Sequence, residues 1–265
     1  MMKPMDTTIG VIGGSGFYEF LDGAREVAME TPYGLPSAPI SIGRIEGTPV
    51  AFLPRHGKDH QFPPHVVNYR ANIWALKELG VRRIIGPCAA GSLRLEMEPG
   101  QFVISDQLVD RTWGRHDTFY DGPRTTHVAF DQPYCPELRA LALARAREVG
   151  IVAHDGGTVV TIQGPRFSTK AESRWFQSLG WEVLNMTQYP EAYLARELEI
   201  CYVNIALITD YDFGLETGAG PVSHEAVLRV FTDNLTRLRT LLTAIVPRIP
   251  EARDCICSRA LAGAT

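Results

Sequence analysis

The feature that most constrains the fold of this chain is an alternation of short apolar runs with stretches of helical periodicity, which continues along most of its length. Runs rich in aliphatic and β-branched residues predict strands at Thr8–Ile12, Val50–Leu53, Arg83–Ile85, Phe102–Ile104, Thr158–Ile162, Val183–Met186 and Cys201–Ile208. Apolar residues at helical spacing predict helices at Val66–Leu79, Cys135–Val149, Lys170–Leu179, Pro190–Leu198 and Ser223–Ile245. Strands that alternate with helices in this way are typical of an α/β fold with a largely buried sheet.

Composition narrows the classes of protein to which the chain can belong. No linker divides the pattern, so residues 1–265 are expected to form a single domain with an irregular C-terminal tail at 248–265. A net charge of −4 without a long basic run argues against a nucleic-acid-binding surface. No segment approaches the roughly 18 apolar residues of a membrane span, and Met1–Thr8 lacks the pattern of a secretory signal. We therefore expect a cytoplasmic protein whose partners include neither nucleic acid nor membrane.

The cysteines also favour a reducing compartment. Five of them, an odd number, are scattered along the chain and read mostly as free thiols, at Cys88, Cys135, Cys201, Cys255 and Cys257. Cys255 and Cys257 are the exception, because two thiols so close together invite redox chemistry or metal binding. A zinc site needs a second pair of ligands, and the neighbouring sequence offers none, so we expect no metal site.

Two motifs that follow predicted strands offer hydrogen-bond donors to an anion. Gly10–Gly16 contains Ser15 and can form a nest of backbone N–H groups, although its spacing fits neither a dinucleotide fingerprint nor a Walker loop. Arg55 and His56 follow another strand, where a guanidinium can bind phosphate through two donors and an imidazole can add a third. Ligands of open α/β sheets gather at the carboxyl ends of strands, so together the two motifs predict an anion site.

Two later segments carry side chains suited to a nucleoside. Phe167 could stack on an aromatic base, Met186 could lie against a sugar, and Thr187 could bind an anion. The alternative for Phe167 and Met186 is ordinary core packing, and for Thr187 it is a turn or cap role before the helix that begins near Pro190. These residues become informative only together with the other motifs.

Two aspartates follow the most apolar predicted strand, Cys201–Ile208. Asp210 and Asp212 lie two positions apart and can face the same cleft, where burial and mutual repulsion raise the pKa of one of them. Such a carboxyl group could act as a general acid near neutral pH. A turn formed by the two aspartates is the alternative.

Taken in order, these segments resemble the methylthioadenosine phosphorylase branch of the purine nucleoside phosphorylase family. The resemblance covers most of the chain except its C-terminal tail. It rests on Ile12–Gly16, Pro54–Gly57, Val67–Lys77, Gly91–Leu93, Phe119–Gly122, Thr161–Ser168, Asn185–Thr187 and Thr209–Asp212. It implies a mixed, curled central sheet flanked by helices, and a homotrimer or dimer of trimers whose sites lie near subunit interfaces.

The resemblance also implies roles for individual residues. Phosphate would be bound by Ser15, Arg55, His56, Cys88, Ala89 and Thr187. The nucleoside would be bound by Phe167, Ser168, Met186, Asp210, Asp212 and His224, together with His127, which reaches a neighbouring subunit's site. Relatives often carry threonine where this chain has Cys88, and a thiol is a poorer donor than a hydroxyl, so that side-chain contact is in doubt.

The chemistry that the resemblance implies is phosphorolysis of an N-glycosidic bond. Cleavage develops positive charge on the sugar and negative charge on the purine. A phosphate dianion would stabilise the first charge and then capture the sugar, while protonated Asp210 would donate its proton to purine N7. Inorganic phosphate is a co-substrate in this scheme, and we expect neither an organic cofactor nor a metal.

The substrate itself stays open between two nucleosides. Aspartates at 210 and 212 together with Ser168 favour an adenine-type base, because carboxylates accept hydrogen bonds from an exocyclic amino group. His224 points the other way, since methylthioadenosine-specific relatives carry a small apolar residue at that position and enzymes that accept a 5′-hydroxyl tend to carry histidine. Methylthioadenosine is therefore favoured only slightly over adenosine, inosine or guanosine.

Two functions of other classes are also compatible with the fold. A non-catalytic nucleoside-binding module would need neither Arg55 nor Asp210, and both residues are present. A nucleosidase that uses water would dispense with part of the phosphate-binding set. The resemblance also extends to Cys255 and Cys257, which are similar to a pair linked to redox behaviour in some thermophilic relatives.

Overall fold

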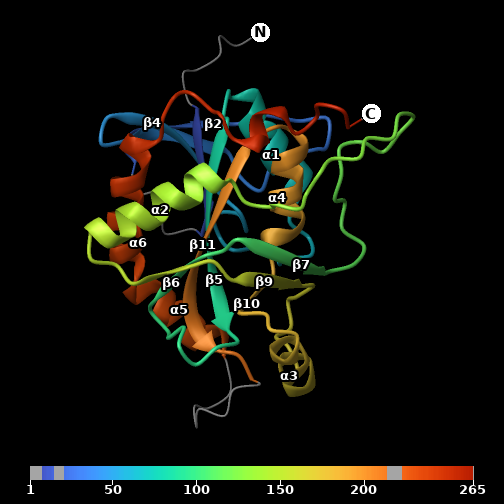
Figure 1. Ribbon diagram of the computed structural model, residues 1–265. Helices are drawn as coiled ribbons and strands as arrows, with labels where there is room; N and C mark the ends of the chain where they lie inside the picture. The colour runs from blue at the N-terminus through green and yellow to red at the C-terminus, as the bar shows by residue number, and fades with distance from the viewer. Residues whose placement is uncertain (1–7, 15–20, 214–222, 265) are drawn as a thin grey trace.

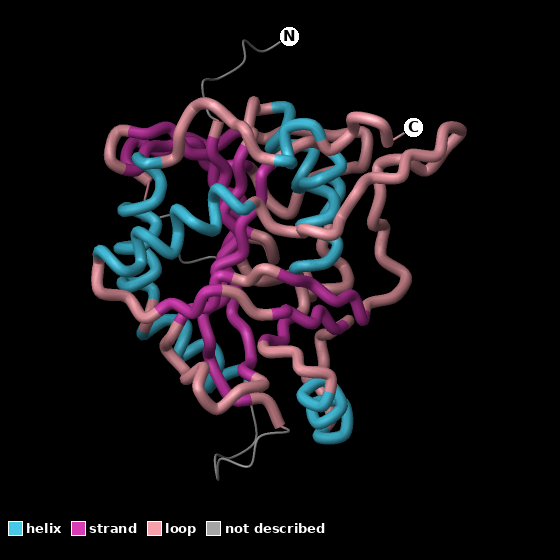
Figure 2. Tube along the Cα trace, in the orientation of Figure 1, coloured by secondary structure: helices cyan, strands magenta, loops and turns pink. Residues whose placement is uncertain are grey.

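The structure is a computed structural model that describes residues 8–14, 21–213 and 223–264. The strands of this part of the chain form one mixed sheet (Figures 1 and 2). They are β1 (Ile9–Gly13), β2 (Asp22–Val27), β3 (Ile40–Ile45), β4 (Thr48–Pro54), β5 (Arg83–Ser92), β6 (Phe102–Ile104), β7 (Gln107–Arg111), β8 (Ala153–Asp155), β9 (Thr158–Ile162), β10 (Val183–Asn185) and β11 (Cys201–Tyr211).

Helices cover both faces of the sheet. They are α1 (Tyr69–Glu78), α2 (Pro136–Glu148), α3 (Lys170–Ser178), α4 (Gln188–Glu197), α5 (His224–Asp233) and α6 (Leu235–Ile245), with 3₁₀ turns at Val246–Arg248 and Ile256–Arg259. Successive residues of a strand face opposite sides of a sheet, so Leu53 packs with α1 and α4 while Phe52 packs with α2 and α6. Figure 1 shows α2 and α6 on one side of the central strands and α1 and α4 on the other. The predicted α/β fold with a mixed sheet flanked by helices is therefore confirmed.

The sheet branches at its central strand, β5. Strand β11 runs parallel to β5 and pairs with it from Arg83 to Ser92, and so occupies the whole of one edge. The opposite edge is shared, because β1 pairs only with Arg83–Ile85 and β10, running antiparallel, pairs only with Gly91 and Ser92. The β5 edge between these two pairings, from Gly86 to Ala90, therefore has no strand partner among the described residues.

The sequence located the central strands better than the peripheral ones. Every predicted strand is present, but β2, β3, β7 and β8 were not predicted. Strand β2 is exposed along most of its length and β7 carries charged residues, so neither shows the buried apolar run on which the prediction relied.

The helix predicted over Ser223–Ile245 is wrong in one respect, because it is two helices. The break lies at Asn234, whose backbone leaves the helical region at φ −103° and ψ 2°. The Asn234 amide donates to the carbonyl of Val230 and its Oδ1 accepts from Arg237, so the side chain competes with the backbone for helical hydrogen bonds.

The expectation that Cys255 and Cys257 lack a second pair of metal ligands is wrong, because the folded chain supplies two cysteines that are distant in the sequence. Folding brings Cys135, at the start of α2, and Cys201, at the start of β11, against them. All five cysteines are free thiols, as expected.

No helix in the described part of the chain is long and apolar enough to cross a membrane.

Candidate active site

A pocket of about 620 Å³ opens where β5 lacks a strand partner. Pro87, Cys88, Ala89 and Ala90 of β5 line it, and all lie on the stretch between the β1 and β10 pairings. Strands β1 and β4 end at this gap from one side, and antiparallel β10 ends at it from the other. The loops at three carboxyl ends therefore meet over one space, and its volume is that of a small-molecule site.

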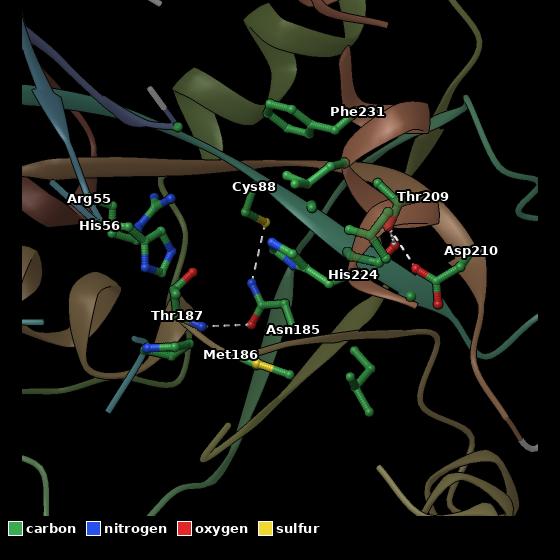
Figure 3. A pocket seen from close by; sticks show the side chains of 18 of the residues that line it. Arg55, His56, Cys88, Asn185, Met186, Thr187, Thr209, Asp210, His224 and Phe231 are labelled. Atoms are coloured by element: carbon green, nitrogen blue, oxygen red, sulfur yellow. Dashed lines mark hydrogen bonds between the residues drawn. The ribbon is translucent and has the colours of Figure 1, made fainter. Parts of the chain in front are cut away.

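Polar side chains stand at two ends of this pocket. Figure 3 shows Arg55, His56 and Thr187 grouped at one end and Thr209 and Asp210 at the other. Arg55 and Asp210 thus line a single pocket although they are 155 positions apart in the chain. This is the arrangement predicted from the strand-end motifs.

Arg55 is held in place by a buried ion pair. Its Nε and Nη2 donate to the two carboxylate oxygens of Glu191 at 2.7 Å each, and Nη2 and Nη1 also donate to the carbonyls of Ile12 and Pro87. Burial alone would lower the pKa of Arg55, but the Glu191 carboxylate raises it above its usual value. The guanidinium is therefore permanently charged, and only one Nη1 hydrogen remains for a ligand.

This geometry changes the way in which Arg55 can bind an anion. The sequence suggested that both donors of the guanidinium fork would face phosphate, but the fork holds Glu191 instead. Tyr202 reinforces the pair by donating to Glu191 Oε1 at 2.6 Å, and Gln188 donates to Tyr202. The positive charge lies at the pocket wall, where its field and a single N–H can act on an anion.

His56 is neutral at physiological pH. Burial and the neighbouring charge of Arg55 lower the pKa of His56 to about 4. Its Nδ1 lies 2.8 Å from the carbonyl of Phe62, which can only accept, so Nδ1 carries the proton. Nε2 is consequently an acceptor rather than the donor expected from the sequence. The His56 ring stacks on His60, with ring centroids 4.5 Å apart.

Thr187 and Cys88 complete the anion end of the pocket. Thr187 is buried and its side chain makes no cap hydrogen bond to α4, and its hydroxyl has no partner among the described residues. Thr187 occupies the N-cap position of α4, as considered from the sequence, but its side chain does not cap the helix. Cys88 accepts hydrogen bonds from the amides of Asn185 and Asn204 through its sulfur, and burial raises the pKa of its thiol. It lines the pocket as a neutral thiol.

A β-bulge positions Asp210 at the opposite end. The register of β11 against β5 shifts between Ile208 and Asp210, which leaves Thr209 as an extra residue and aligns Asp210 with Gly91. A Cβ on residue 91 would lie 3.2 Å from Asp210 Oδ2, so glycine leaves room for the carboxyl group. The ladder resumes at Asp210, and the extra residue explains why the side chain of this strand-end aspartate faces the pocket.

The pKa of Asp210 is raised to about 6. Burial is the main cause, opposed by a hydrogen bond of 2.7 Å from the Thr209 hydroxyl, while the charge of Asp212 raises the pKa further. The predicted effects of burial and of the second carboxylate are both present. Asp210 can therefore hold a proton close to neutral pH and release it to a ligand.

Asp212 and Ser168 form a buried pair beside Asp210. The Ser168 hydroxyl lies 2.7 Å from each oxygen of Asp212 and can donate to only one of them at a time. Asp212 lines the pocket, so its carboxylate keeps acceptor capacity for a ligand. Ser168 orients this carboxylate and is itself absent from the pocket wall.

The pocket wall also includes Phe167 and Met186. Gly164 leaves room for Met186, because a Cβ on residue 164 would lie 2.6 Å from the Met186 sulfur and its φ of +61° disfavours other residues. Arg115 holds this wall through its Nη2, which donates to the carbonyls of Gln163 and Met186. The pocket wall thus offers an aromatic ring and a thioether as well as two carboxyl groups.

Helix α5 closes the remaining side. Ser223 caps it by accepting from the N–H of Ala226, as predicted, and His224 occupies the first helical position and lines the pocket. The ring of His224 lies 5.9 Å from that of His60. Apolar side chains follow it along the helix toward the pocket, at Val227, Leu228 and Phe231.

Most of the residues singled out from the sequence meet here. The pocket wall includes Arg55, His56, Cys88, Ala89, Phe167, Met186, Thr187, Asp210, Asp212 and His224. Ser15 lies outside the described residues, although its neighbour Gly14 lines the pocket. His127 is exposed and lies apart from the pocket of its own chain.

Three functional contributions were missed in the sequence. Glu191 and Arg115 act through other residues, so no pattern near them signals a role, and each is recognisable only from its partners. His60 lies on the pocket wall four residues after His56 and stacks on it. The short His56–His60 spacing was the one signal that was available.

Comparisons with known proteins agree with this geometry. A sequence model described as the phosphorylase superfamily matches residues 8–247. The chain is 51% identical to a purine nucleoside phosphorylase of Streptomyces coelicolor, over 99% of this chain and 97% of that protein. It is 55% identical to an S-methyl-5′-thioadenosine phosphorylase of Mycolicibacterium smegmatis, over 93% of each.

Solved structures show the same fold. A methylthioadenosine phosphorylase sourced from an antarctic soil metagenomic library superposes with a TM-score of 0.92 at 39% identity, covering 99% of this chain and 93% of the other. A methylthioadenosine phosphorylase from Schistosoma mansoni in complex with adenine superposes with a TM-score of 0.88 at 35% identity, covering 94% and 93%.

Proposed function

Since this chain belongs to the phosphorylase superfamily, we propose that it cleaves the N-glycosidic bond of a purine nucleoside with inorganic phosphate. The observation that carries this proposal is one pocket with anion-binding groups at one end and a carboxyl group of pKa about 6 at the other. A phosphate and a nucleoside can occupy it together, with the sugar between them. The products are a free purine and a sugar 1-phosphate.

The phosphate is held by the positive end of the pocket. The Thr187 hydroxyl and the remaining Nη1 hydrogen of Arg55 donate to its oxygens, and the Arg55 charge attracts the dianion. His56 Nε2, which is bare in the neutral ring, accepts from the P–OH group of hydrogenphosphate. We assign no contact to Ser15, which lies outside the described residues.

The purine lies at the carboxylate end. Phe167 and Met186 pack against base and sugar, and protonated Asp210 donates to N7 as the glycosidic bond breaks. The proton neutralises the charge that develops on the purine, while the phosphate oxygen forms the new bond to C1′ on the opposite face of the sugar. Atoms and charges balance without a cofactor.

The substrate that we favour is S-methyl-5′-thioadenosine. The Asp212 carboxylate can accept from the exocyclic amino group of adenine, and the apolar face of α5 suits a methylthio group. An ordinary purine nucleoside with a 5′-hydroxyl is the alternative, because His224 on the same helix can bind that hydroxyl. Relatives with each name match the chain at similar identity.

His224→Val is expected to shift the preference toward methylthioadenosine. The substitution removes the only imidazole of α5 from the pocket and leaves an apolar side chain of the kind that packs against a methylthio group. The ratio of kcat/KM for methylthioadenosine to that for adenosine should rise by about tenfold. His65→Val, at an exposed position off the pocket wall, is the control. An unchanged ratio in His224→Val would remove His224 from substrate recognition.

Cys88→Thr is expected to tighten phosphate binding. Threonine offers a hydroxyl donor where the thiol is a poor one, and its oxygen can still accept from Asn185 and Asn204. One added hydrogen bond to a charged group lowers the KM for phosphate by about tenfold. Cys88→Val has the shape of threonine without the hydroxyl and should bring no gain. Equal KM values for the two variants would place Cys88 outside the phosphate site.

The direct test of the proposed function is base release from pure protein. A panel of methylthioadenosine, methylthioinosine, adenosine, inosine and guanosine is incubated with and without phosphate, and products are separated chromatographically. We expect purine and sugar 1-phosphate from at least one nucleoside, and only when phosphate is present. Release of base with free sugar would indicate a nucleosidase, and binding without turnover would indicate a non-catalytic module.

We further propose that the chain acts in the cytoplasm as a homotrimer. The segment between β7 and α2 is largely irregular and reaches away from the body (Figure 1). It carries His127 and the most exposed large apolar side chain of the described residues, Trp113, at 73%. A neighbouring subunit would cover this surface. Light scattering tests the oligomer directly.

A further inference from the structure

Four of the five cysteines converge at one place, and none of the four lines the proposed nucleoside pocket. Cys135 immediately precedes α2, Cys201 begins β11, and Cys255 and Cys257 flank the start of the last 3₁₀ turn. All four side chains are buried, and their sulfur atoms all lie within 4.8 Å of one another. Folding therefore gathers three distant parts of the chain around one small group of thiols.

The spacing of the sulfurs matches a tetrahedral metal site. Zinc–sulfur bonds of about 2.3 Å place the four sulfurs of a tetrahedral site roughly 3.8 Å apart. The Sγ atoms of Cys201 and Cys255 lie 3.3 Å apart, and no pair in the cluster exceeds 4.8 Å. Small adjustments of side-chain torsions would place all four around one ion. Thiolates are the ligands that structural zinc sites prefer.

Positively charged side chains near the cluster also favour an anionic group there. Arg196 is buried, and its guanidinium donates to the backbone carbonyls of Ala129 and Gln132 and to the sulfur of Cys257. No carboxylate of the described residues forms an ion pair with it. A buried guanidinium is stable only beside a compensating negative charge, which neutral thiols do not supply.

A second arginine approaches the same region. Arg253 lies in the chain just before the cysteine pair, and its Nη1 donates to the backbone carbonyl of Glu199. A zinc ion with four thiolates carries a net charge of about −2, which Arg196 and Arg253 together offset. Four neutral thiols would leave both cations beside an uncharged cluster.

We propose that Cys135, Cys201, Cys255 and Cys257 bind one zinc ion as a closed structural site. Binding displaces four thiol protons to solvent and consumes no oxidant. All four coordination positions are taken by protein sulfur, so the ion would have no open position for catalysis. The site is independent of the proposed phosphorolysis.

The consequence of this site is an anchored C-terminal segment. The segment after α6 crosses one end of the sheet with little regular structure (Figure 1). Arg83 donates to carbonyls of Glu251 and Ala252, and the N–H of His127 donates to the carbonyl of Ala264. Zinc would hold the segment against α2 and β11 and so support the backbone at His127.

Zinc content of the full-length protein tests this proposal. The protein is purified without an affinity tag or chelator, and metals are quantified by mass spectrometry. We expect about one zinc ion per chain, released only when a mercurial titrates the thiols. Cys255→Ser and Cys257→Ser should reduce zinc to background, whereas Cys88→Ser, which removes a buried thiol outside the cluster, should keep it.

Two further measurements keep the test decisive if a serine variant fails to fold. Wild-type protein stripped of metal under reducing conditions is titrated with Co²⁺, and the intense charge-transfer bands of a tetrahedral tetrathiolate site are expected. Free thiols are also counted after the protein is unfolded in chelator without reductant. If the four cysteines bound zinc, all five cysteines of the chain are then found as free thiols. Three results would each overturn the proposal. The first is the absence of both zinc and a cobalt spectrum, and the second is iron in place of zinc. The third is a count of only one or three free thiols, which would indicate disulfides.

Discussion

Asp210→Asn is expected to lower kcat for phosphorolysis by about 10²- to 10⁴-fold, the usual contribution of a general acid. Asparagine keeps the shape of the side chain and can still accept from Thr209, but it has no acidic proton for the purine. The KM for phosphate should change little, because the anion-binding groups lie at the other end of the pocket. Asp22→Asn, on exposed strand β2, is the matched control and should retain full activity.

The pH profile separates this role from a structural one. The proton of Asp210 is needed, and its pKa is raised to about 6, so wild-type kcat/KM should fall as pH rises through about 6. Asp210→Asn should lack that limb while keeping any other ionisation in the profile. A profile with the same limb in both proteins would assign the ionisation to another group.

The same substitution should stabilise the fold at neutral pH. The folded pKa of Asp210 is higher than the value of about 3.9 typical of an unfolded chain, so the native state binds more protons between those two values and stability falls as pH rises across them. Above pH 6 the loss is complete, and it amounts to at most about 2 kcal/mol because Asp210 is not fully buried. Urea unfolding at pH 7.5 should therefore show Asp210→Asn to be as stable as wild type or more stable. A large destabilisation would mean that the carboxylate has a structural role.

Glu191→Gln is expected to have the largest effect on stability. It leaves the buried Arg55 charge without its counter-ion and with a poorer set of acceptors, which costs about 3–5 kcal/mol in the free energy of unfolding. Denaturant unfolding monitored by circular dichroism measures the loss. Glu148→Gln is the control, because Glu148 is 56% exposed and solvent screens its pair with Arg145, so that the loss is expected to be about 0–1 kcal/mol.

A double variant shows whether the unpaired charge is the cause. Arg55→Met in the Glu191→Gln background removes the stranded cation, so part of the lost stability should return. If Glu191→Gln alone unfolds as wild type does, the ion pair does not hold Arg55 in place. Activity should be lost in every variant that lacks Arg55, whatever its stability.

The sequence predicted the core of the fold because its core strands are unusually apolar. Strands β5 and β11 are buried along almost their whole length, so continuous hydrophobic runs indicate them directly. Strand β2 forms by pairing with β3. Its own sequence is exposed and carries no signal of this partner. The break at Asn234 depends on a side chain that competes for backbone hydrogen bonds, and helical periodicity does not register it.

The same distinction applies to the candidate site. Many residues that line the pocket lie in motifs at strand ends, which is why Arg55, Thr187 and Asp210 could be named in advance. The unpaired stretch of β5 depends on the register of three strands, which no local motif contains. Glu191 and the four-cysteine cluster act through contacts between distant segments, and only the folded chain reveals them.

The measurement that bears most directly on the pocket is a crystal structure with phosphate and an uncleavable methylthioadenosine analogue. We expect phosphate oxygens within hydrogen-bond distance of Thr187 Oγ1 and Arg55 Nη1, and purine N7 within hydrogen-bond distance of the Asp210 carboxyl group. The sugar should lie between them, over the unpaired edge of β5. A purine bound away from Asp210, or a phosphate bound outside the gap between β1 and β10, would contradict the proposed arrangement.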